Sequence, residues 1–319
     1  MALIRNVPVA PSLNFVSLRR LTLALAAALI VVSAIAFGAF GLNLGVDFRG
    51  GIVIQAQTTP ETTLAGMRDS LAELDLGDTN IQRFGEAHTV LIRIQEQAGG
   101  EEAQNAAIER VKEHLQPQVT SYERTEFVGP QVGEELKQAG MMATGLALLA
   151  MAAYIWFRFE WQFAVAGLAA LIHDVVTTIG FFSITQLQFN LGTVAAVLTI
   201  AGYSINDTVV VFDRVRETVR RYKRKPMPEL LNIAVNSTVT RTVLTSTTTL
   251  VALIALAIFG GAVIRSFTWA LIWGVLIGTF SSIGVAVPLL LQMRLSPSTL
   301  VQEEDETAKQ QAKAAGSSS

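Results

Sequence analysis

Six apolar segments, each of 18 or more residues, constrain the fold of this 319-residue chain more than any other feature. An α-helix of roughly 20 residues crosses the hydrocarbon core of a bilayer, so each segment is long enough to span a membrane. The composition agrees, because 51% of the residues are hydrophobic and only 16% are charged. The sequence therefore predicts an integral membrane protein with six spans. We expect these spans at residues 21–41, 140–157, 162–185, 191–212, 242–261 and 267–291.

The first apolar segment is predicted to be an uncleaved anchor rather than a signal peptide. Ala34, Ile35 and Ala36 resemble a signal-peptidase site. However, the apolar run is longer than the 7 to 15 residues of a signal peptide's apolar region, and a long N-terminal region that ends in Arg19 and Arg20 precedes it. We therefore expect residues 1–20 to be cytoplasmic and residues 21–41 to form the first transmembrane helix.

Residues 42–138, between the first two spans, have the patterns of a small α+β domain. Apolar and polar residues alternate where strands are expected, and apolar residues recur at helical spacing in between. The resulting βαββαβ order predicts a ferredoxin-like domain. In chain order the expected elements are a strand at 52–57, a helix at 64–74, a hairpin of strands at 80–84 and 89–95, a helix after Gly99 and Gly100, and a strand at 119–127.

The charges and the missing cysteines exclude several classes of function. Residues 42–138 hold 16 acidic and 8 basic residues, which argues against nucleic acid as a partner of this domain. The chain has no cysteine, so disulfides, thiolate chemistry and cysteine metal sites are excluded. It also lacks a Gly-Lys dipeptide, so it has no Walker A loop, and no nucleophile with its base and orienting group is apparent. We therefore expect no enzyme activity, no cofactor and no metal.

Basic residues in the links between spans predict the orientation. Arg158 follows the second span and seven basic residues follow the fourth, between 214 and 225, whereas 186–190 carry none. Cytoplasmic links are enriched in Lys and Arg, so these links and both termini are predicted to be cytoplasmic. The 42–138 domain then lies in the periplasm of a bacterial inner membrane.

The remaining parts follow from that topology. Residues 139–293 are expected to form a five-helix bundle containing a basic cytoplasmic loop at 213–240. Within this loop, residues 226–236 have the spacing of a short amphipathic helix on the membrane surface. Residues 294–319 are polar and low in complexity, which predicts a disordered cytoplasmic tail.

Asp207 lies inside the fourth apolar segment, where a carboxylate needs a partner or a water pathway. A charge near the centre of a transmembrane helix costs roughly 3 kcal/mol, so such residues face one another or a functional pathway. Tyr203, Ser204 and Asn206 lie close to Asp207 in the sequence and are candidates for its polar surroundings. Burial and a nearby cation shift the protonation of a carboxyl group in opposite directions. Reversible protonation is therefore the chemistry that this residue suits.

Two more spans carry polar residues, which predicts a polar seam through the bundle. The third span contains His173 and Asp174, and the fifth contains Arg241. By depth, Arg241 is a candidate partner for Asp207, and Asp174 with His173 for a proton relay. Alternatively, Asp174 or His173 caps a neighbouring helix, and Arg241 extends to the cytoplasmic surface as an orientation signal. In the fifth span, Thr245 and Thr248 follow Arg241 at helical spacing and are expected to join the seam.

Two glycine-bearing links join the domain to the membrane. The first contains Gly45, Asp47, Gly50 and Gly51, and the second contains Gly129 and Pro130. Glycine permits turns and hinges that other residues do not. We expect a turn into the first strand and a domain that can move relative to the bundle.

Four motifs resemble the SecD/SecF family of bacterial protein-export membrane proteins. They occur in the order in which the family has them, and the fourth is similar to the family's fourth transmembrane segment. The resemblance covers nearly the whole chain, apart from about the first eighteen residues and those after Met293. The motifs are GVDFRGG at 45–51, VGPQVGEEL at 128–136, HDV at 173–175 and GYSINDTVVVFDRVRE at 202–217.

The resemblance implies half of a resistance-nodulation-division (RND) type bundle that pairs with a SecD-like subunit beside the SecYEG channel. YajC is a further candidate partner. The family resemblance also implies that proton flow through Asp207 and Arg241 drives export of unfolded polypeptide across the inner membrane. Two alternatives remain open: a non-pumping scaffold or insertion factor, and half of an RND-type small-molecule exporter.

Overall fold

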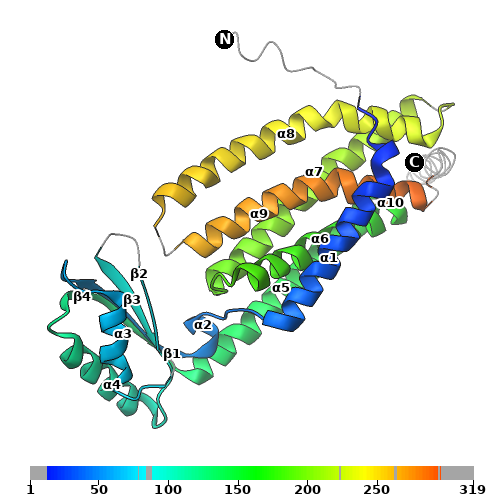
Figure 1. Ribbon diagram of the computed structural model, residues 1–319. Coiled ribbons are helices and arrows are strands. Elements are labelled where there is room, and N and C mark those ends of the chain that lie inside the picture. Colours follow the sequence, from blue (N-terminus) through cyan, green and yellow to red (C-terminus); the bar gives the residue numbers. More distant parts are fainter. Residues whose placement is uncertain are drawn as a thin grey trace, which may run out of the picture.

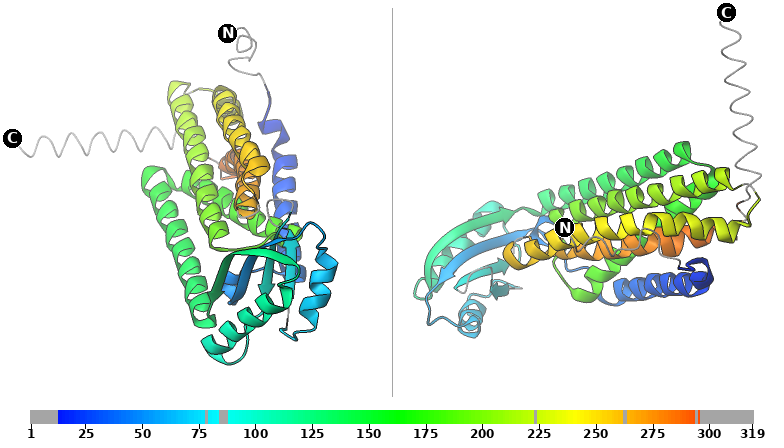
Figure 2. Two further views of the ribbon diagram at one scale, coloured as in Figure 1. Left: turned by 90° about the vertical axis from the view of Figure 1, so that its left-hand side faces the viewer. Right: turned by 90° about the horizontal axis from the view of Figure 1, so that it is seen from above.

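The computed structural model describes residues 13–77, 79–83, 88–222, 224–261, 264–293 and 295. Long helices run side by side to form an elongated bundle, and a small α+β domain lies at one end of it (Figure 1, Figure 2). Six helices in the described part of the chain are long and apolar enough to cross a membrane, which confirms the predicted six-span class. The bundle elements are η1 (Val16–Leu18), α1 (Arg19–Phe40), α5 (Pro130–Arg158), α6 (Trp161–Thr185), α7 (Leu191–Arg221), α8 (Met227–Phe259), α9 (Arg265–Ser281), η2 (Ser282–Ala286) and α10 (Val287–Gln292).

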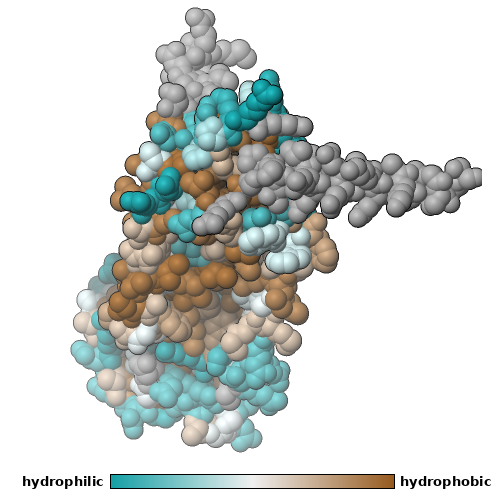
Figure 3. All heavy atoms as spheres, turned by 90° about the vertical axis from the view of Figure 1, so that its right-hand side faces the viewer, coloured by the Kyte–Doolittle hydropathy of each residue, from teal (hydrophilic) through white to brown (hydrophobic). Residues whose placement is uncertain are grey.

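The surface of the bundle is suited to lipid. Large apolar side chains such as Leu149, Phe157 and Phe259 are 67%, 89% and 85% exposed. In the space-filling view an apolar surface separates the polar domain from polar residues at the other end of the molecule (Figure 3). Side chains that are exposed to this degree are stable in a hydrocarbon environment and costly in water. The bundle is therefore the membrane-embedded part of the chain.

Small residues allow the central helices to pack closely. On α9, a Cβ atom added to Gly274 would lie 2.2 Å from Cγ1 of Ile200 on α7, and one added to Gly278 would lie 3.3 Å from Cβ of Ser204. Transmembrane helices often use small residues four apart in this way. These two glycines thus form a packing face, and the close contact brings the polar residues of α7 and α9 together.

Ion pairs fix the end of α7 that lies far from the α+β domain. Arg158 Nη2 lies 2.8 Å from Asp213 Oδ1, and Arg216 Nη2 lies 3.1 Å from Glu160 Oε1. Both guanidinium groups also lie over the ring of Phe159. The second pair is mostly buried, so it holds α7 against the link between α5 and α6.

The α+β domain has the predicted ferredoxin-like order. Its four strands form an antiparallel sheet with the order β2-β3-β1-β4. The helices cover one face, where Ile52, Ile54 and Ile92 are fully buried, and the other face is open towards the bundle (Figure 1). The elements are α2 (Val46–Arg49), β1 (Gly51–Thr58), α3 (Leu64–Ala72), β2 (Thr79–Arg83), β3 (Thr89–Ile94), α4 (Gly100–Leu115) and β4 (Val119–Val128).

Three local predictions were wrong, and a fourth falls almost entirely outside the described residues. The separate surface helix at 226–236 is the first part of α8, which runs unbroken into the fifth span, and the loop at 213–240 is mostly helix. The reason is that Leu230 and Leu231 are fully buried in the main core rather than at a membrane surface. The turn at 45–51 contains the short helix α2. The predicted disordered tail, apart from Leu295, lies outside the described residues.

Candidate functional site

Asp174 on α6 is fully buried in the centre of the bundle and accepts hydrogen bonds from two other helices. Its Oδ2 atom accepts from Ser204 Oγ on α7 at 2.5 Å and from Ser281 Oγ on α9 at 2.7 Å. Its Oδ1 atom lies 2.9 Å from Nδ1 of His173, which is also buried. A buried carboxylate is stable only when its oxygens are satisfied in this way. The HDV motif therefore places an acid and an imidazole in contact inside the membrane.

Asp207 lies less than a full turn after Ser204 on α7 and is held by two further hydroxyl groups. Thr242 Oγ1 on α8 donates to its Oδ1 atom at 2.8 Å, and Ser282 Oγ donates to its Oδ2 atom at 2.5 Å. The side chain is only partly buried. The fourth span thus contributes to both acids, through Ser204 to Asp174 and directly through Asp207.

Consecutive serines in the last span join the two acids. Ser281 contacts Asp174 and Ser282 contacts Asp207. They stand where α9 changes into the π-helical segment η2. Single π-helical turns inside α-helices frequently occur at functional sites, because they redirect side chains within one turn. Here the change of helix type coincides with the link between the carboxylates.

A second chain of hydroxyl groups extends this network between α7, α8 and α9. Tyr203 Oη lies 3.1 Å from Ser246 Oγ, which lies 2.6 Å from Thr279 Oγ1. Five of the hydroxyl residues in the network were missed from the sequence. The clearest signal in the sequence is the pair of consecutive serines, Ser281 and Ser282, that follows Gly274 and Gly278 in the last apolar segment. These residues are Thr242, Ser246, Thr279, Ser281 and Ser282.

The expected contact between Arg241 and Asp207 is not formed. Thr242 turns towards Asp207, and the preceding residue on a helix points about 100° away. Arg241 is exposed, lies close enough to Asp207 for Coulomb attraction, and forms no ion pair with the described residues. Thr245 and Thr248 are exposed as well, and Thr248 donates to backbone carbonyls of its own helix. These three residues lie outside the seam.

Exposed polar residues of α7 lie on the same side as those of α8. In an antiparallel helix pair, the residues that precede two facing residues point to the same side of the pair. Asp207 and Thr242 face each other, so Asn206 and Arg241 share one side, and both are exposed. Lipid is a poor environment for an amide and a guanidinium group. This side therefore requires a cover other than lipid. Its members are Thr199, Gly202 and Asn206 on α7 and Arg241, Thr245 and Thr248 on α8.

The first glycine-bearing link meets the bundle at the turn between α6 and α7. Asp47 Oδ2 accepts a hydrogen bond of 3.0 Å from the backbone N–H of Leu191, the first residue of α7. Gly50 and Gly51 have φ values of 73° and 117°, which other residues rarely adopt. Gly129 has an extended backbone and precedes Pro130, which begins α5. Glycine is therefore required for conformation at 50 and 51.

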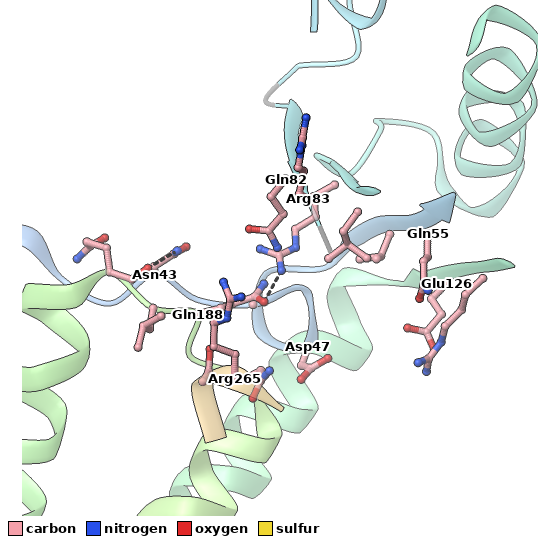
Figure 4. Close-up of a pocket in the computed structure, with 17 residues that line it drawn as sticks. Asn43, Asp47, Gln55, Gln82, Arg83, Glu126, Gln188 and Arg265 are labelled. Carbon is pink, nitrogen blue, oxygen red and sulfur yellow. Dashed lines mark hydrogen bonds and ion pairs between the residues drawn. The ribbon is translucent and has the colours of Figure 1, made fainter. Parts of the chain in front are cut away.

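A polar cavity of about 260 Å³ lies beside this junction, between the open face of the sheet and the end of the bundle (Figure 4). Arg83 and Arg93 from the sheet, and Arg265 from the start of α9, line it together with Asp47. Arg93 donates to Gln188 in the turn between α6 and α7. Burial lowers the pKa of Arg93, and the nearby charge of Asp47 raises it. The domain is thus attached to the bundle through side chains as well as through its two links.

Two family descriptions match the chain. The C-terminal region of the protein export membrane protein SecD/SecF matches residues 107–296, and the SecD/SecF GG motif matches residues 35–62.

Curated relatives with the name protein translocase subunit SecF are similar over most of their length. The relative from Rickettsia felis is 42% identical over 290 residues, which are 90% of this chain and 94% of the relative. The relative from Magnetococcus marinus is 46% identical over 284 residues, which are 88% and 91%.

The structure is similar to crystal structures of SecDF. SecDF from Thermus thermophilus, described as a translocon-associated membrane protein, matches with a TM-score of 0.81 and 34% identity over 90% of this chain. A super-membrane-facing form of SecDF matches with a TM-score of 0.65 and 32% identity over 95% of this chain. The chain spans 39% of the first SecDF chain and 40% of the second.

Proposed function

The chain belongs to the SecD/SecF family of protein-export membrane proteins, and on this premise we propose that it uses the proton-motive force to promote protein export across the bacterial inner membrane. An accessory role in Sec translocation follows from the family. Proton use and the partners are the substance of the proposal. The observation that carries it is the pair of acids, Asp174 and Asp207, linked through Ser281 and Ser282 in an apolar bundle.

The geometry suits a carboxyl group that gains and loses a proton. Each oxygen of Asp207 accepts from a hydroxyl of a different segment, so a change in its charge changes how α7 is held to α8 and to the last span. Moving one charge across the membrane supplies about 2.3 kcal/mol per 100 mV. That is enough to shift a two-state equilibrium more than tenfold. A proton at Asp207 can therefore drive a change in helix packing.

We assign the polar side of α7 and α8 to a SecD-like partner. Arg241 and Asn206 are exposed on this side, where lipid would leave them unsatisfied. The chain also corresponds to 39% of the SecDF chain from Thermus thermophilus, which suits one half of a two-part assembly. Arg241 would then act on Asp207 from the interface with the partner. The SecYEG channel, YajC and an unfolded polypeptide are further proposed partners, on the basis of the family resemblance.

We place the α+β domain in the periplasm and the opposite end of the bundle in the cytoplasm. The support is the concentration of arginines at the end of α7 that lies far from the domain, including Arg214, Arg216 and Arg221. Cytoplasmic ends of spans are enriched in such residues. A periplasmic domain is in a position to contact a polypeptide as it leaves the membrane.

Replacing Asp207 with Asn tests the proton role. Asn has nearly the same shape and keeps one acceptor oxygen, but it cannot carry the proton. We expect Asp207→Asn to insert and to assemble with its partner, yet to lose the uncoupler-sensitive part of export. Asp213→Asn is the matched control, because Asp213 lies on the same helix but pairs with Arg158 at an exposed site. Its export should remain normal.

The measurement is export of a secretory protein with and without an uncoupler, at equal levels of assembled complex. Full uncoupler-sensitive export by Asp207→Asn would show that the acid has a packing role. The chain would then be a non-pumping scaffold, the alternative that the sequence left open.

A further inference from the structure

The role of the GVDFRGG segment at 45–51 is not explained by the acids in the bundle. Its aspartate, Asp47, contacts α7, the helix that carries Asp207. Asp47 Oδ2 accepts from the N–H of Leu191 at 3.0 Å, while Asn190 Oδ1 accepts from the N–H of Thr193 at 2.9 Å. The first N–H groups of a helix have no partner within the helix, and a negative charge there is favourable. The N-terminus of α7 is thus capped by its own asparagine and by an acid from the domain link.

The backbone of the same link pairs with the turn that precedes α7. The N–H of Gly45 donates to Phe189 O at 2.7 Å, and the N–H of Phe189 donates to Asn43 O at 2.8 Å. A Cβ atom at Gly45 would lie 3.1 Å from Cβ of Asn190 and 3.3 Å from Phe189 O, so a larger residue would require these neighbours to shift by a few tenths of an ångström. This contact explains the first glycine of the motif by close approach rather than by flexibility.

On its other side, the link is attached to the domain and to the start of α5. Gly51 begins β1, and a Cβ atom there would lie 2.7 Å from Ile94 O in β3. A Cβ atom at Gly133 in α5 would lie 3.2 Å from the backbone nitrogen of Gly50. The segment therefore lies between the sheet, α5 and the N-terminus of α7, as the labelled Asp47 and Gln188 illustrate (Figure 4). A displacement of the domain acts directly on this segment.

We propose that Asp47 is a positioning residue that transmits movement of the periplasmic domain to α7 and thereby to Asp207. The proposal rests on the proposed function. α7 is continuous from Leu191 to Arg221, so a displacement of its first residue is carried along a rigid rod. Asp207 lies about 24 Å along that rod at 1.5 Å per residue. There it is held by Thr242 on α8 and Ser282 in the last span, which are neighbouring elements that need not move with α7.

Two substitutions remove the same hydrogen bond from opposite sides. Asp47→Ala removes the acceptor. Leu191→Pro removes only the donor, because proline lacks the N–H but is well tolerated at the first position of a helix. Asn190 has an extended backbone, as a residue before proline requires. Asp47→Asn keeps an acceptor oxygen and is the conservative variant.

The experiment uses the assembled complex in vesicles. Cysteines at Gln82 and Arg265, which line opposite sides of the junction cavity, are joined by a bifunctional maleimide to hold the domain. The readout is the rate at which an apolar carbodiimide modifies the carboxyl group of Asp207, measured by mass spectrometry. In the parent, cross-linking should change this rate at least threefold.

In Asp47→Ala and in Leu191→Pro, cross-linking should leave the modification rate of Asp207 unchanged, and the double variant should behave like either single one. Asp47→Asn should retain most of the parent response. An unchanged rate in the cross-linked parent, or a parent-like response in both Asp47→Ala and Leu191→Pro, would overturn the coupling. Should one of these variants fail to assemble, the other gives the answer, because they change different residues.

The outcome is separate from the proton test. If cross-linking does not change the modification rate of Asp207, the role of Asp47 is refuted, but the proposed proton role of Asp207 in export is not. Conversely, normal export by Asp207→Asn refutes the proton role whatever the modification rates are.

Discussion

Adding one methyl group at Gly274 should disturb the contact between α7 and α9 that assembles the site. The new Cβ would lie 2.2, 2.5 and 2.6 Å from Cγ1, Cδ1 and Cγ2 of Ile200. Carbon atoms prefer separations of about 3.5 to 4.0 Å, so the overlap is about 1 Å with all three carbons. A change of rotamer moves one carbon away and another closer. The helices must therefore separate.

Two opposing effects determine how Gly274→Ala changes stability: the cost of overpacking and the higher helix propensity of alanine. Overpacking a close-packed interior costs about 1–3 kcal/mol, and the triple overlap places Gly274→Ala near the upper end. Alanine is favoured over glycine in a helix by about 1 kcal/mol. We therefore expect a net loss of about 2 kcal/mol, and a fall in melting temperature of roughly 3 °C for a chain of 319 residues. Gly145→Ala on α5 is the control, because a Cβ there meets nothing within 4 Å.

A double-mutant cycle identifies the cause. Ile200→Ala alone leaves a cavity and should cost about 2–5 kcal/mol. In the double variant, the alanine at 274 occupies part of the space that Ile200 leaves. The double variant should therefore be more stable than the sum of the single effects predicts, by at least about 2 kcal/mol.

The assay is thermal unfolding of the purified complex, combined with uncoupler-sensitive export. Separation of α7 and α9 by about 1 Å would also lengthen the 2.5 Å hydrogen bond from Ser282, the residue after α9, to Asp207 on α7, so export should fall with stability. The reasoning is refuted if Gly274→Ala melts at the same temperature as Gly145→Ala, or if the two single effects are additive.

Two further predictions concern the end of the bundle that lies far from the α+β domain and the orientation of the chain in the membrane. Glu160→Gln should lower stability by about 3 kcal/mol, because Arg216 loses its partner in a pair whose side chains are 19% and 11% exposed. Glu217→Gln, which breaks only an exposed pair with Arg214, should change stability by less than about 0.5 kcal/mol in the same unfolding assay. A cysteine at Glu101 should react with an impermeant maleimide added to cells with a permeabilised outer membrane, whereas one at Glu217 should not. The reverse labelling would overturn the assigned orientation.

The soluble domain was predictable because its signals are local. The alternation of Ile54 and Ala56 with Gln55 and Gln57 defines which face of the first strand is buried, and the structure confirms the predicted βαββαβ order. The acids of the bundle were predictable for a related reason. A carboxylate in an apolar segment is costly, so Asp174 and Asp207 stand out without any knowledge of their neighbours.

The partners of these acids were not predictable, because serine and threonine in transmembrane helices usually bond to their own backbone. Thr248 does so, whereas Thr242 donates to Asp207. The sequence does not distinguish them, because the difference depends on which face of α8 meets α7. The prediction of a contact between Arg241 and Asp207 was wrong for the same reason, because the sequence does not show which residues of α8 face α7.

The prediction of a separate helix at 226–236 before the fifth span was wrong for a different reason. Asn232 and Asn236 resemble residues of a surface loop, but their side chains bind the backbone of Val16 and Leu13. They belong to the interior of a long helix because a distant segment satisfies their amides. A local pattern cannot contain that information.

The consecutive serines of the last span have a choice of acceptors. Ser281 Oγ lies 2.7 Å from Asp174 and 3.2 Å from the carbonyl of Gly278, and Ser282 Oγ lies 2.5 Å from Asp207 and 3.1 Å from the carbonyl of Thr279. A hydroxyl group has one hydrogen to donate, and a carboxyl group that takes up a proton becomes a donor itself. Each serine is then a rotor that can turn back to its own helix.

Serine bonds to a preceding carbonyl bend helices. Here the rotors stand at a π-helical turn, where the regular ladder of the last span is already interrupted. Arrival of a proton at either acid would thus be converted into a change in the curvature of that span.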